Sequence, residues 1–172
     1  MIYILEGPDG AGKSTLANQI AAEKKASVLH CYFDPTWDIR AHHLDMLLAA
    51  QKIQPWLPVV LDRWALSELI YGTVFRGKPA YDVLKLMNTS LDWFETTWIY
   101  CRTDSVIEDH RRNQETRHEI FDDMTKVVEM YDDFIAHDEL RDWVKYDFYK
   151  DNMAEFVAAL PGENYITREV TT

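Results

Sequence analysis

Five short apolar runs lie along the chain and are separated by segments with helical periodicity. The runs cover residues 2–6, 27–32, 59–62, 97–101 and 144–148. Most are continuous rather than alternating, which is typical of strands with helices on both faces. Strands that alternate with helices favour a parallel α/β sheet. The pattern therefore predicts an α/β fold with a five-stranded parallel sheet in three α/β/α layers.

The clearest helical periodicity lies in the last third of the chain. Apolar residues recur at i, i+3, i+4 and i+7 from Met124 to Ile135, and the same spacing returns from Met153 to Leu160. Asn152, with Glu155 three residues later, resembles a capping box for the last helix. We interpret both apolar stripes as faces that pack in the core.

Length and charge limit the organisation of the protein and its partners. The 172 residues contain no repeat and no Gly/Ser linker, which predicts a single domain over 1–172. The formal net charge of -11 opposes binding of a polyanion, because nucleic-acid affinity normally depends on a basic surface. No nucleic acid polymer is therefore expected as a partner.

The start of the chain and its two cysteines give indications of the cellular compartment. Met1 leads directly into the first apolar run with no basic region, and no apolar run approaches the length of a membrane span. Cys31 and Cys101 each lie inside an apolar run, and their spacing suggests neither a disulfide framework nor a metal site. We expect a cytoplasmic protein without a membrane partner, in which both cysteines are buried.

A phosphate-binding loop follows the first predicted strand. Residues 7–14 read Gly-Pro-Asp-Gly-Ala-Gly-Lys-Ser and match G-x-x-x-x-G-K-[ST]. The glycines let successive N–H groups and a helix N-terminus point at a bound phosphate. Lys13 is expected to reach the β- and γ-phosphates, and the Ser14 hydroxyl to ligate Mg²⁺. ATP and Mg²⁺ are the expected cofactors. The predicted nucleotide-binding residues are Gly7, Asp9, Gly10, Ala11, Gly12, Lys13, Ser14 and Thr15.

A second motif closes the apolar run at 59–62. Asp62 ends this run, which would place it beside the first strand and near the metal. No glutamate follows Asp62 to activate water, and no Asn-Lys-x-Asp guanine-binding motif occurs, so a kinase is favoured over an ATPase motor or a GTPase switch. Arg63 adds a bidentate fork suited to holding a phosphate.

Together these motifs resemble those of the thymidylate kinase family, over roughly residues 2–135. Residues 6–15, Glu-Gly-Pro-Asp-Gly-Ala-Gly-Lys-Ser-Thr, are similar to its E-G-x-D-G-x-G-K-[ST]-T, and residues 62–64, Asp-Arg-Trp, to its D-R-[YH]. Ser67 and Tyr71 fall where the family has S-x-x-A-[YF]. The segment at about 110–119 looks like its arginine-bearing lid, with Arg111, Arg112, Arg117 and Glu119. The short chain is also similar to bacteriophage-encoded members.

This resemblance implies an activity and a set of roles. The activity is ATP-dependent phosphorylation of a deoxynucleoside monophosphate, dTMP or a related pyrimidine nucleotide, to the diphosphate. Arg63 would grip the acceptor 5′-phosphate, Asp62 would support Mg²⁺ through water, and Asp9 would lie near the acceptor sugar or phosphate. The family is commonly homodimeric, which implies a homodimer here. The implied catalytic residues are Lys13, Asp62, Arg63, Arg111, Arg112 and Arg117.

One segment departs from the family and leaves the acceptor open. The family usually carries R-E-P-G-G-T after its second strand, whereas residues 31–37 here read Cys-Tyr-Phe-Asp-Pro-Thr-Trp. Another deoxynucleotide, a modified pyrimidine nucleotide or an unphosphorylated nucleoside are alternatives to dTMP. Asp34 would suit a nucleoside kinase, where a carboxylate accepts the 5′-hydroxyl proton, or it simply initiates a turn. The Asp-Arg-Trp form, instead of the Glu-Arg-Ser of nucleoside kinases, favours monophosphates.

Several further residues are candidates for the acceptor pocket. Trp37 and Tyr71 could offer aromatic planes for a base, while Arg40 and Arg76 could offer donor forks for its edge. Packing or surface roles are equally compatible with each of these residues. The full predicted substrate-binding set is Asp9, Asp34, Trp37, Arg40, Arg63, Ser67, Tyr71 and Arg76.

Overall fold

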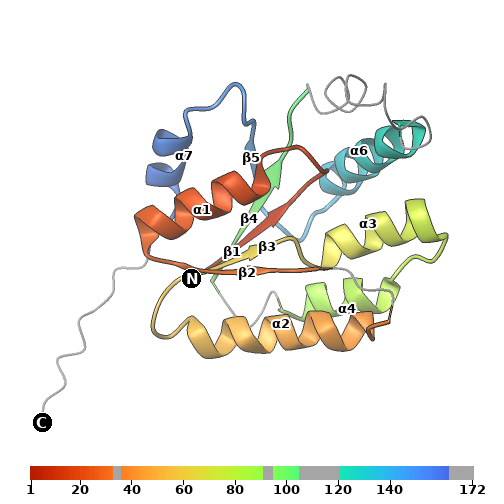
Figure 1. Cartoon of the computed structure of the whole chain (residues 1–172), viewed down its shortest axis with the longest axis horizontal. Helices are drawn as coiled ribbons and strands as arrows, with labels where there is room; N and C mark the ends of the chain where they lie inside the picture. The colour runs from red at the N-terminus through yellow and green to blue at the C-terminus, as the bar shows by residue number, and fades with distance from the viewer. Residues whose placement is uncertain (33–35, 91–94, 105–120, 163–172) are drawn as a thin grey trace, which may run out of the picture.

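A single parallel sheet organises the chain. The computed structural model describes residues 1–32, 36–90, 95–104 and 121–162. All five strands are parallel, in the order β2-β3-β1-β4-β5, which confirms the predicted sheet. The elements are β1 (Ile2–Glu6), α1 (Lys13–Lys24), β2 (Ser27–His30), α2 (Ile39–Ile53), β3 (Val59–Asp62), α3 (Ala65–Arg76), α4 (Tyr81–Ser90), β4 (Thr96–Cys101), α6 (Phe121–Ala136), β5 (Trp143–Tyr146) and α7 (Met153–Ala159) (Figure 1).

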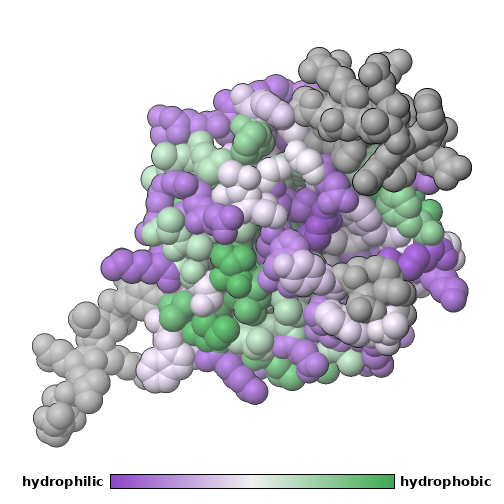
Figure 2. Space-filling model, viewed as in Figure 1, coloured by the Kyte–Doolittle hydropathy of each residue, from purple (hydrophilic) through white to green (hydrophobic). Residues whose placement is uncertain are grey.

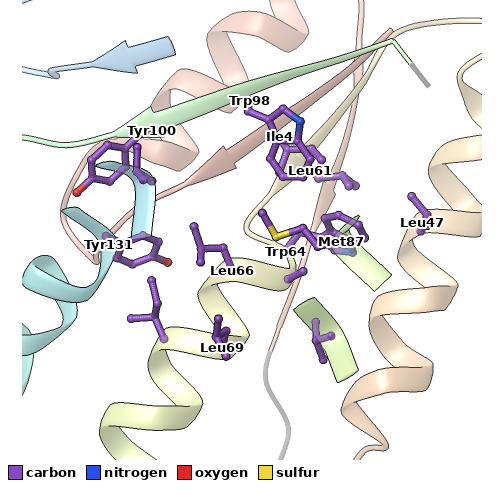
Figure 3. Packing of buried hydrophobic residues seen from close by; sticks show 14 of the residues in the cluster. Ile4, Leu47, Leu61, Trp64, Leu66, Leu69, Met87, Trp98, Tyr100 and Tyr131 are labelled. Atoms are coloured by element: carbon purple, nitrogen blue, oxygen red, sulfur yellow. The ribbon is translucent and has the colours of Figure 1, made fainter. Parts of the chain in front are cut away.

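Helices cover both faces of the sheet. Helices α1 and α7 lie on one face, and α2, α3, α4 and α6 lie on the other (Figure 1). Successive residues of β1 point to opposite faces, so Tyr3 packs in the α1 layer and Ile4 in the α3 layer. Figure 3 shows the core on the face covered by α2, α3, α4 and α6, where Trp98 and Ile4 of the strands face Trp64 and Met87. The predicted three-layer α/β/α architecture is confirmed.

Two strands end earlier than the sequence pattern predicts. β2 ends at His30 and β5 at Tyr146, in each case two residues before the predicted end. After β5 the backbone N–H of Asp151 donates to the carbonyl of Asp147 (2.9 Å), so the chain turns where a strand was expected to continue. These turns leave His30 and the loop after Tyr146 at the same edge of the sheet.

The last helix begins as its sequence predicts. The side-chain oxygen of Asn152 accepts hydrogen bonds from the backbone N–H groups of Ala154 (3.1 Å) and Glu155 (3.3 Å). The carboxylate of Glu155 accepts from the side-chain amide of Asn152 (3.2 Å), rather than from its backbone N–H. The cap is therefore a side-chain variant of the predicted box.

The surface and the cysteines also bear on the sequence predictions. Hydrophilic and hydrophobic residues are interspersed over the face seen in Figure 2. Among the helices that the structure describes, none is both long and apolar enough to cross a membrane. Cys31 and Cys101 are both buried and both free thiols, as predicted.

Candidate active site

The candidate site lies at the carboxyl ends of the central strands. β1 pairs with β3 on one side and with β4 on the other, so the chain connections diverge at this point. In parallel α/β sheets this divergence opens a crevice at the strand ends, where ligands bind. The loops that lead into α1 and α3 both start here (Figure 1).

The loop between β1 and α1 requires glycine at two positions. Gly7 has φ +142°, and a Cβ there would lie 2.1 Å from the carbonyl oxygen of Cys101. Gly12 has φ +77°, and a Cβ there would lie 2.5 Å from the ring of Phe148. Any side chain would therefore clash at either position. The first turn of α1 carries no acidic residue, so its N-terminus is free to attract an anion.

Lys13 is folded back into this loop. Its side chain is buried, and its ammonium group donates a hydrogen bond to the carbonyl oxygen of Pro8. Burial, together with the charge of Arg63 nearby, lowers the pKa of Lys13 to about 8. The lysine is thus charged near neutral pH but poorly solvated, which favours its interaction with a bound phosphate.

Asp62 is buried at the end of β3 and carries an unusual arrangement of hydrogen bonds. Its Oδ2 accepts from the Ser14 hydroxyl (2.7 Å) and lies 2.8 Å from Nδ1 of His30. Its Oδ1 is buried and has no hydrogen-bond partner within the described part of the chain. An unpaired buried carboxylate oxygen is unfavourable, so this atom suits a ligand that brings positive charge or bound water.

These two residues fit a magnesium site of the kind that uses substrate phosphates. Mg²⁺ is commonly held by one or two carboxylates, several waters and phosphate oxygens. Ser14 and Asp62 provide a hydroxyl and a carboxylate side by side. Within the residues that the structure describes, no group of three or more His, Cys, Asp and Glu side chains is arranged to hold a metal ion. Water and nucleotide phosphates would therefore supply the remaining ligands of a metal held by Ser14 and Asp62.

Arg63 has a strained backbone and a well-contacted side chain. Its φ of +69° is uncommon for a residue other than glycine, and such strain occurs mainly at functional sites. The guanidinium forms an ion pair with Asp9, donates to the Ser67 hydroxyl (3.3 Å) and to the carbonyl of Gly7 (3.4 Å), and lies 5.0 Å from the ring centre of Tyr71. The contacts fix a cationic fork beside the phosphate loop.

Glu6 stabilises the turn that contains Arg63. This fully buried carboxylate accepts hydrogen bonds from the backbone N–H groups of Trp64, Leu66 and Ser67, each at 3.1 Å. Burial raises the pKa of Glu6, although hydrogen bonds from Ser67 and the charge of Arg63 act in the opposite direction. Glu6 belongs to the quoted family motif, but its sequence context did not indicate this role.

Arg63 lines two cavities. The first, of about 420 Å³, follows the phosphate loop and is lined by Gly10, Lys13 and Thr15 among others, and by Phe148. We call it the donor cavity. The second, of about 450 Å³, lies between the end of β2 and helices α2 and α3, and we call it the acceptor cavity. Both are lined by Asp9, His30 and Arg63, so the two cavities meet at these residues.

The structure brings together most of the predicted acceptor residues that it describes. Asp9, Arg63, Ser67, Tyr71 and Arg76 all line the acceptor cavity. Tyr71 and Phe75 stack with their ring centres 5.7 Å apart, so one wall of this cavity is aromatic.

Other predicted residues lie elsewhere. Trp37 packs against the ring of His42, and neither Trp37 nor Arg40 lines either of the two cavities. Asp34 and the lid arginines Arg111, Arg112 and Arg117 lie outside the described residues. Their roles remain predictions.

Several cavity-lining residues were not predicted as site residues, among them His30, Glu68 and Phe148. His30 lines both cavities, Glu68 lines the acceptor cavity, and Phe148 covers Gly12 in the donor cavity. Glu68 forms an ion pair with Arg76, two helical turns away, across Gly72. The sequence carried no direct signal for His30, because its strand was predicted to continue to residue 32 and only the register of β2 against β3 places it opposite Asp62.

Comparisons with known proteins agree with this fold. No protein-family model matches the chain, and neither does any curated protein. Among solved structures, YorR protein of Bacillus subtilis in complex with phosphorylated GDP has a TM-score of 0.71 at 18% identity, over 92% of each chain. Thymidylate kinase from Ehrlichia chaffeensis has a TM-score of 0.59 at 14% identity, over 91% of this chain and 94% of that one.

A third solved structure also has a similar fold. Deoxyadenosine kinase from M. mycoides with bound dATP has a TM-score of 0.57 at 15% identity, over 92% of this chain and 97% of that one. Likenesses at such low identities establish the architecture and leave the substrate undetermined. The chain therefore has the P-loop fold found in nucleotide and nucleoside kinases.

Proposed function

We propose that the protein transfers the γ-phosphoryl group of ATP to a deoxynucleoside monophosphate, with dTMP or a related pyrimidine nucleotide as the leading acceptor. The observation that carries the proposal is the meeting of two cavities at Asp9, His30 and Arg63. One cavity follows a phosphate-binding loop, and the other has an aromatic wall and a cationic fork at its inner end. This arrangement suits two nucleotides bound with their phosphates toward each other.

Different residues bind ATP, the acceptor and the metal ion. The loop amides and Lys13 hold the phosphates of ATP, and Arg63 holds the phosphate of the acceptor. Ser14 and Asp62 would hold Mg²⁺, which neutralises charge that develops on the phosphate oxygens. An oxygen of the acceptor phosphate forms a bond to the γ-phosphorus while the bond to the β,γ-bridging oxygen breaks, so ADP leaves and a diphosphate is formed.

Arg63 has to exchange partners for this reaction. In the structure its guanidinium is paired with Asp9. An acceptor phosphate offers the guanidinium a planar pair of oxygens and a greater charge than a carboxylate does, which favours the exchange. The guanidinium also lies over the Tyr71 ring, 5.0 Å from its centre, a contact that would hold Arg63 at this wall of the cavity.

A nucleoside kinase is the second candidate. It is favoured by the fold shared with a deoxyadenosine kinase and by the absence of the family's R-E-P-G-G-T segment from residues 31–37. Asp34 would then accept the proton of the 5′-hydroxyl group. The acceptor cavity is compatible with a nucleoside as well as with a monophosphate.

One experiment separates the two candidates. Purified protein is incubated with ATP and Mg²⁺ and with each common nucleoside and nucleoside monophosphate in turn, and both ADP release and the phosphorylated product are measured. Phosphorylation of dTMP without phosphorylation of thymidine would support the leading proposal. The reverse result would support the nucleoside kinase, and no transfer to any acceptor of either class would overturn both.

A further inference from the structure

His30 connects the acceptor cavity to the carboxylate of Asp62. In the pairing of β2 with β3, His30 lies directly opposite Asp62. Its Nδ1 lies 2.8 Å from Oδ2 of Asp62, and its ring lines both cavities. A carboxylate oxygen accepts hydrogen bonds, so this contact is a hydrogen bond in the tautomer that carries a proton on Nδ1 of His30.

The hydrogen bonds of Asp62 are concentrated on one oxygen. Ser14 and His30 both contact Oδ2, while Oδ1 has no partner within the described part of the chain although it is buried. A carboxylate whose only task was structural would be expected to satisfy both oxygens. Two contacts on one oxygen, in contrast, prevent the group from rotating and leave the other oxygen available.

We propose that His30 is a positioning residue, which holds the Asp62 carboxylate by Oδ2 so that Oδ1 remains available to the hydrated Mg²⁺ of the bound nucleotide. The inference rests on the proposed function in that it assumes a Mg²⁺-nucleotide in the donor cavity. Ser14 cannot maintain this orientation by itself, because its hydroxyl is also expected to ligate the metal. Partners that orient a metal-binding carboxylate typically contribute about 10- to 100-fold in metal affinity.

Three substitutions of His30 separate this role from general packing. In His30→Asn the side-chain amide nitrogen occupies nearly the place of Nδ1 and can donate to Asp62. In His30→Gln the amide nitrogen falls nearer the place of Nε2, and His30→Ala removes the donor. Asn and Gln are both polar and similar in volume, so the comparison between them depends on where the donor lies.

The readout is metal binding rather than turnover. Mn²⁺ serves as a paramagnetic probe for Mg²⁺, and its affinity for the protein–ADP complex is measured by electron paramagnetic resonance. We expect about 10-fold weaker Mn²⁺ binding in His30→Ala and His30→Gln, and a change of less than about 3-fold in His30→Asn. ADP affinity without metal should be the same in all four proteins, and thermal unfolding of each protein checks that it is folded.

The possible failures can be told apart. Unchanged Mn²⁺ affinity in His30→Ala, equal losses in the Asn and Gln variants, or no Mn²⁺ binding by the wild-type ADP complex would each overturn the inference. The acceptor panel with the wild-type protein tests the proposed function separately. A protein that binds Mn²⁺ in the expected His30-dependent way but phosphorylates no acceptor would retain the inference and lose the proposed function.

Discussion

The donor and acceptor cavities have similar volumes, about 420 and 450 Å³, but they are built in different ways. The donor cavity follows one continuous loop, in which backbone conformation at Gly7 and Gly12 decides the shape. The acceptor cavity is built from side chains that come from β2, α2 and α3. A phosphate-binding loop can thus be encoded by consecutive residues, whereas the acceptor cavity is assembled from residues that are distant in sequence.

The largest effect is expected at the donor cavity. Replacement of Lys13 by methionine keeps most of the side-chain volume but removes the charge that faces the phosphates, so kcat should fall by about 1,000-fold with every acceptor. Steady-state kinetics with ATP and the best acceptor of the panel measure the change. Lys52→Met, at an exposed position of α2, is the matched control. Substantial activity in Lys13→Met would show that the phosphate loop does not take part in the mechanism as proposed.

The next effect should be selective for the acceptor cavity. Arg63→Ala removes the fork that would hold the acceptor phosphate, so KM for a monophosphate should rise by about 100-fold. Arg63→Lys keeps a positive charge without the bidentate geometry, so its KM should lie between those of the wild type and Arg63→Ala. ADP affinity, measured by calorimetry, should change much less. If Arg63→Ala instead weakened ADP as strongly as the monophosphate, the assignment of this residue to the acceptor would be wrong.

A third prediction concerns the stability cost of the donor cavity. The pKa of Lys13 is lowered from 10.5 to about 8, so the buried ammonium opposes folding fully below about pH 8. This penalty disappears as pH rises from about 8 to 10.5, because the folded state then loses the proton first. Lys13→Met should therefore increase the free energy of unfolding by about 3 kcal/mol near pH 7.

The pH dependence of that difference provides the check. Urea unfolding of both proteins near pH 7 and near pH 10 should show a gap that shrinks at the higher pH. Other titrating groups are common to both proteins and cancel in the difference. A Lys13→Met protein that is less stable than wild type at both pH values would show that the ammonium group stabilises the loop.

The smallest effect is expected at Gly72, under the Glu68–Arg76 ion pair. A Cβ at Gly72 would lie 2.8 Å from Nη2 of Arg76 and 2.9 Å from the backbone carbonyl oxygen of Lys78, so alanine should shift the chain after α3 and displace Arg76 from the acceptor cavity wall. We expect about a 5-fold increase in acceptor KM with unchanged ADP affinity, consistent with a partly exposed ion pair. Kinetics with varied acceptor and fixed ATP measure it.

A second glycine, Gly162, provides the control for this prediction. A Cβ at Gly162 would meet only Lys24 Nζ, at an ordinary contact distance of 3.7 Å. Gly162→Ala should therefore leave both substrates unaffected. An equal change in the two variants would show that the Gly72 effect does not come from Arg76.

The part of the donor cavity that is lined by the phosphate loop could be predicted from the sequence because those residues lie within 9–15. The loop motif gave Lys13 and Ser14 their expected places, and the apolar strand that ends at Asp62 indicated its position beside β1. His30 could not be assigned in the same way. Its partner is 32 residues away in sequence, and only the register of β2 against β3 brings the two side chains together.

The acceptor cavity was predicted only in part, for a similar reason. Ser67 and Tyr71 follow Arg63 at helical spacing and could be placed from the quoted motif. The contact of Glu68 with Arg76 depends on a long side chain that crosses Gly72, which helical spacing alone does not reveal. Trp37 and Arg40 lie at the start of α2 but outside both cavities, because the direction of α2 is decided by packing of residues such as Leu47.

The pairing of Asp9 with Arg63 gives the resting protein an internal competitor for its substrate. Any anion that seeks the guanidinium must first displace a tethered carboxylate. Inorganic phosphate has no base or sugar with which to offset that displacement, whereas a complete nucleotide gains contacts along the aromatic wall. Under the proposed function, the pair would therefore act as a threshold that disfavours small anions relative to a complete nucleotide.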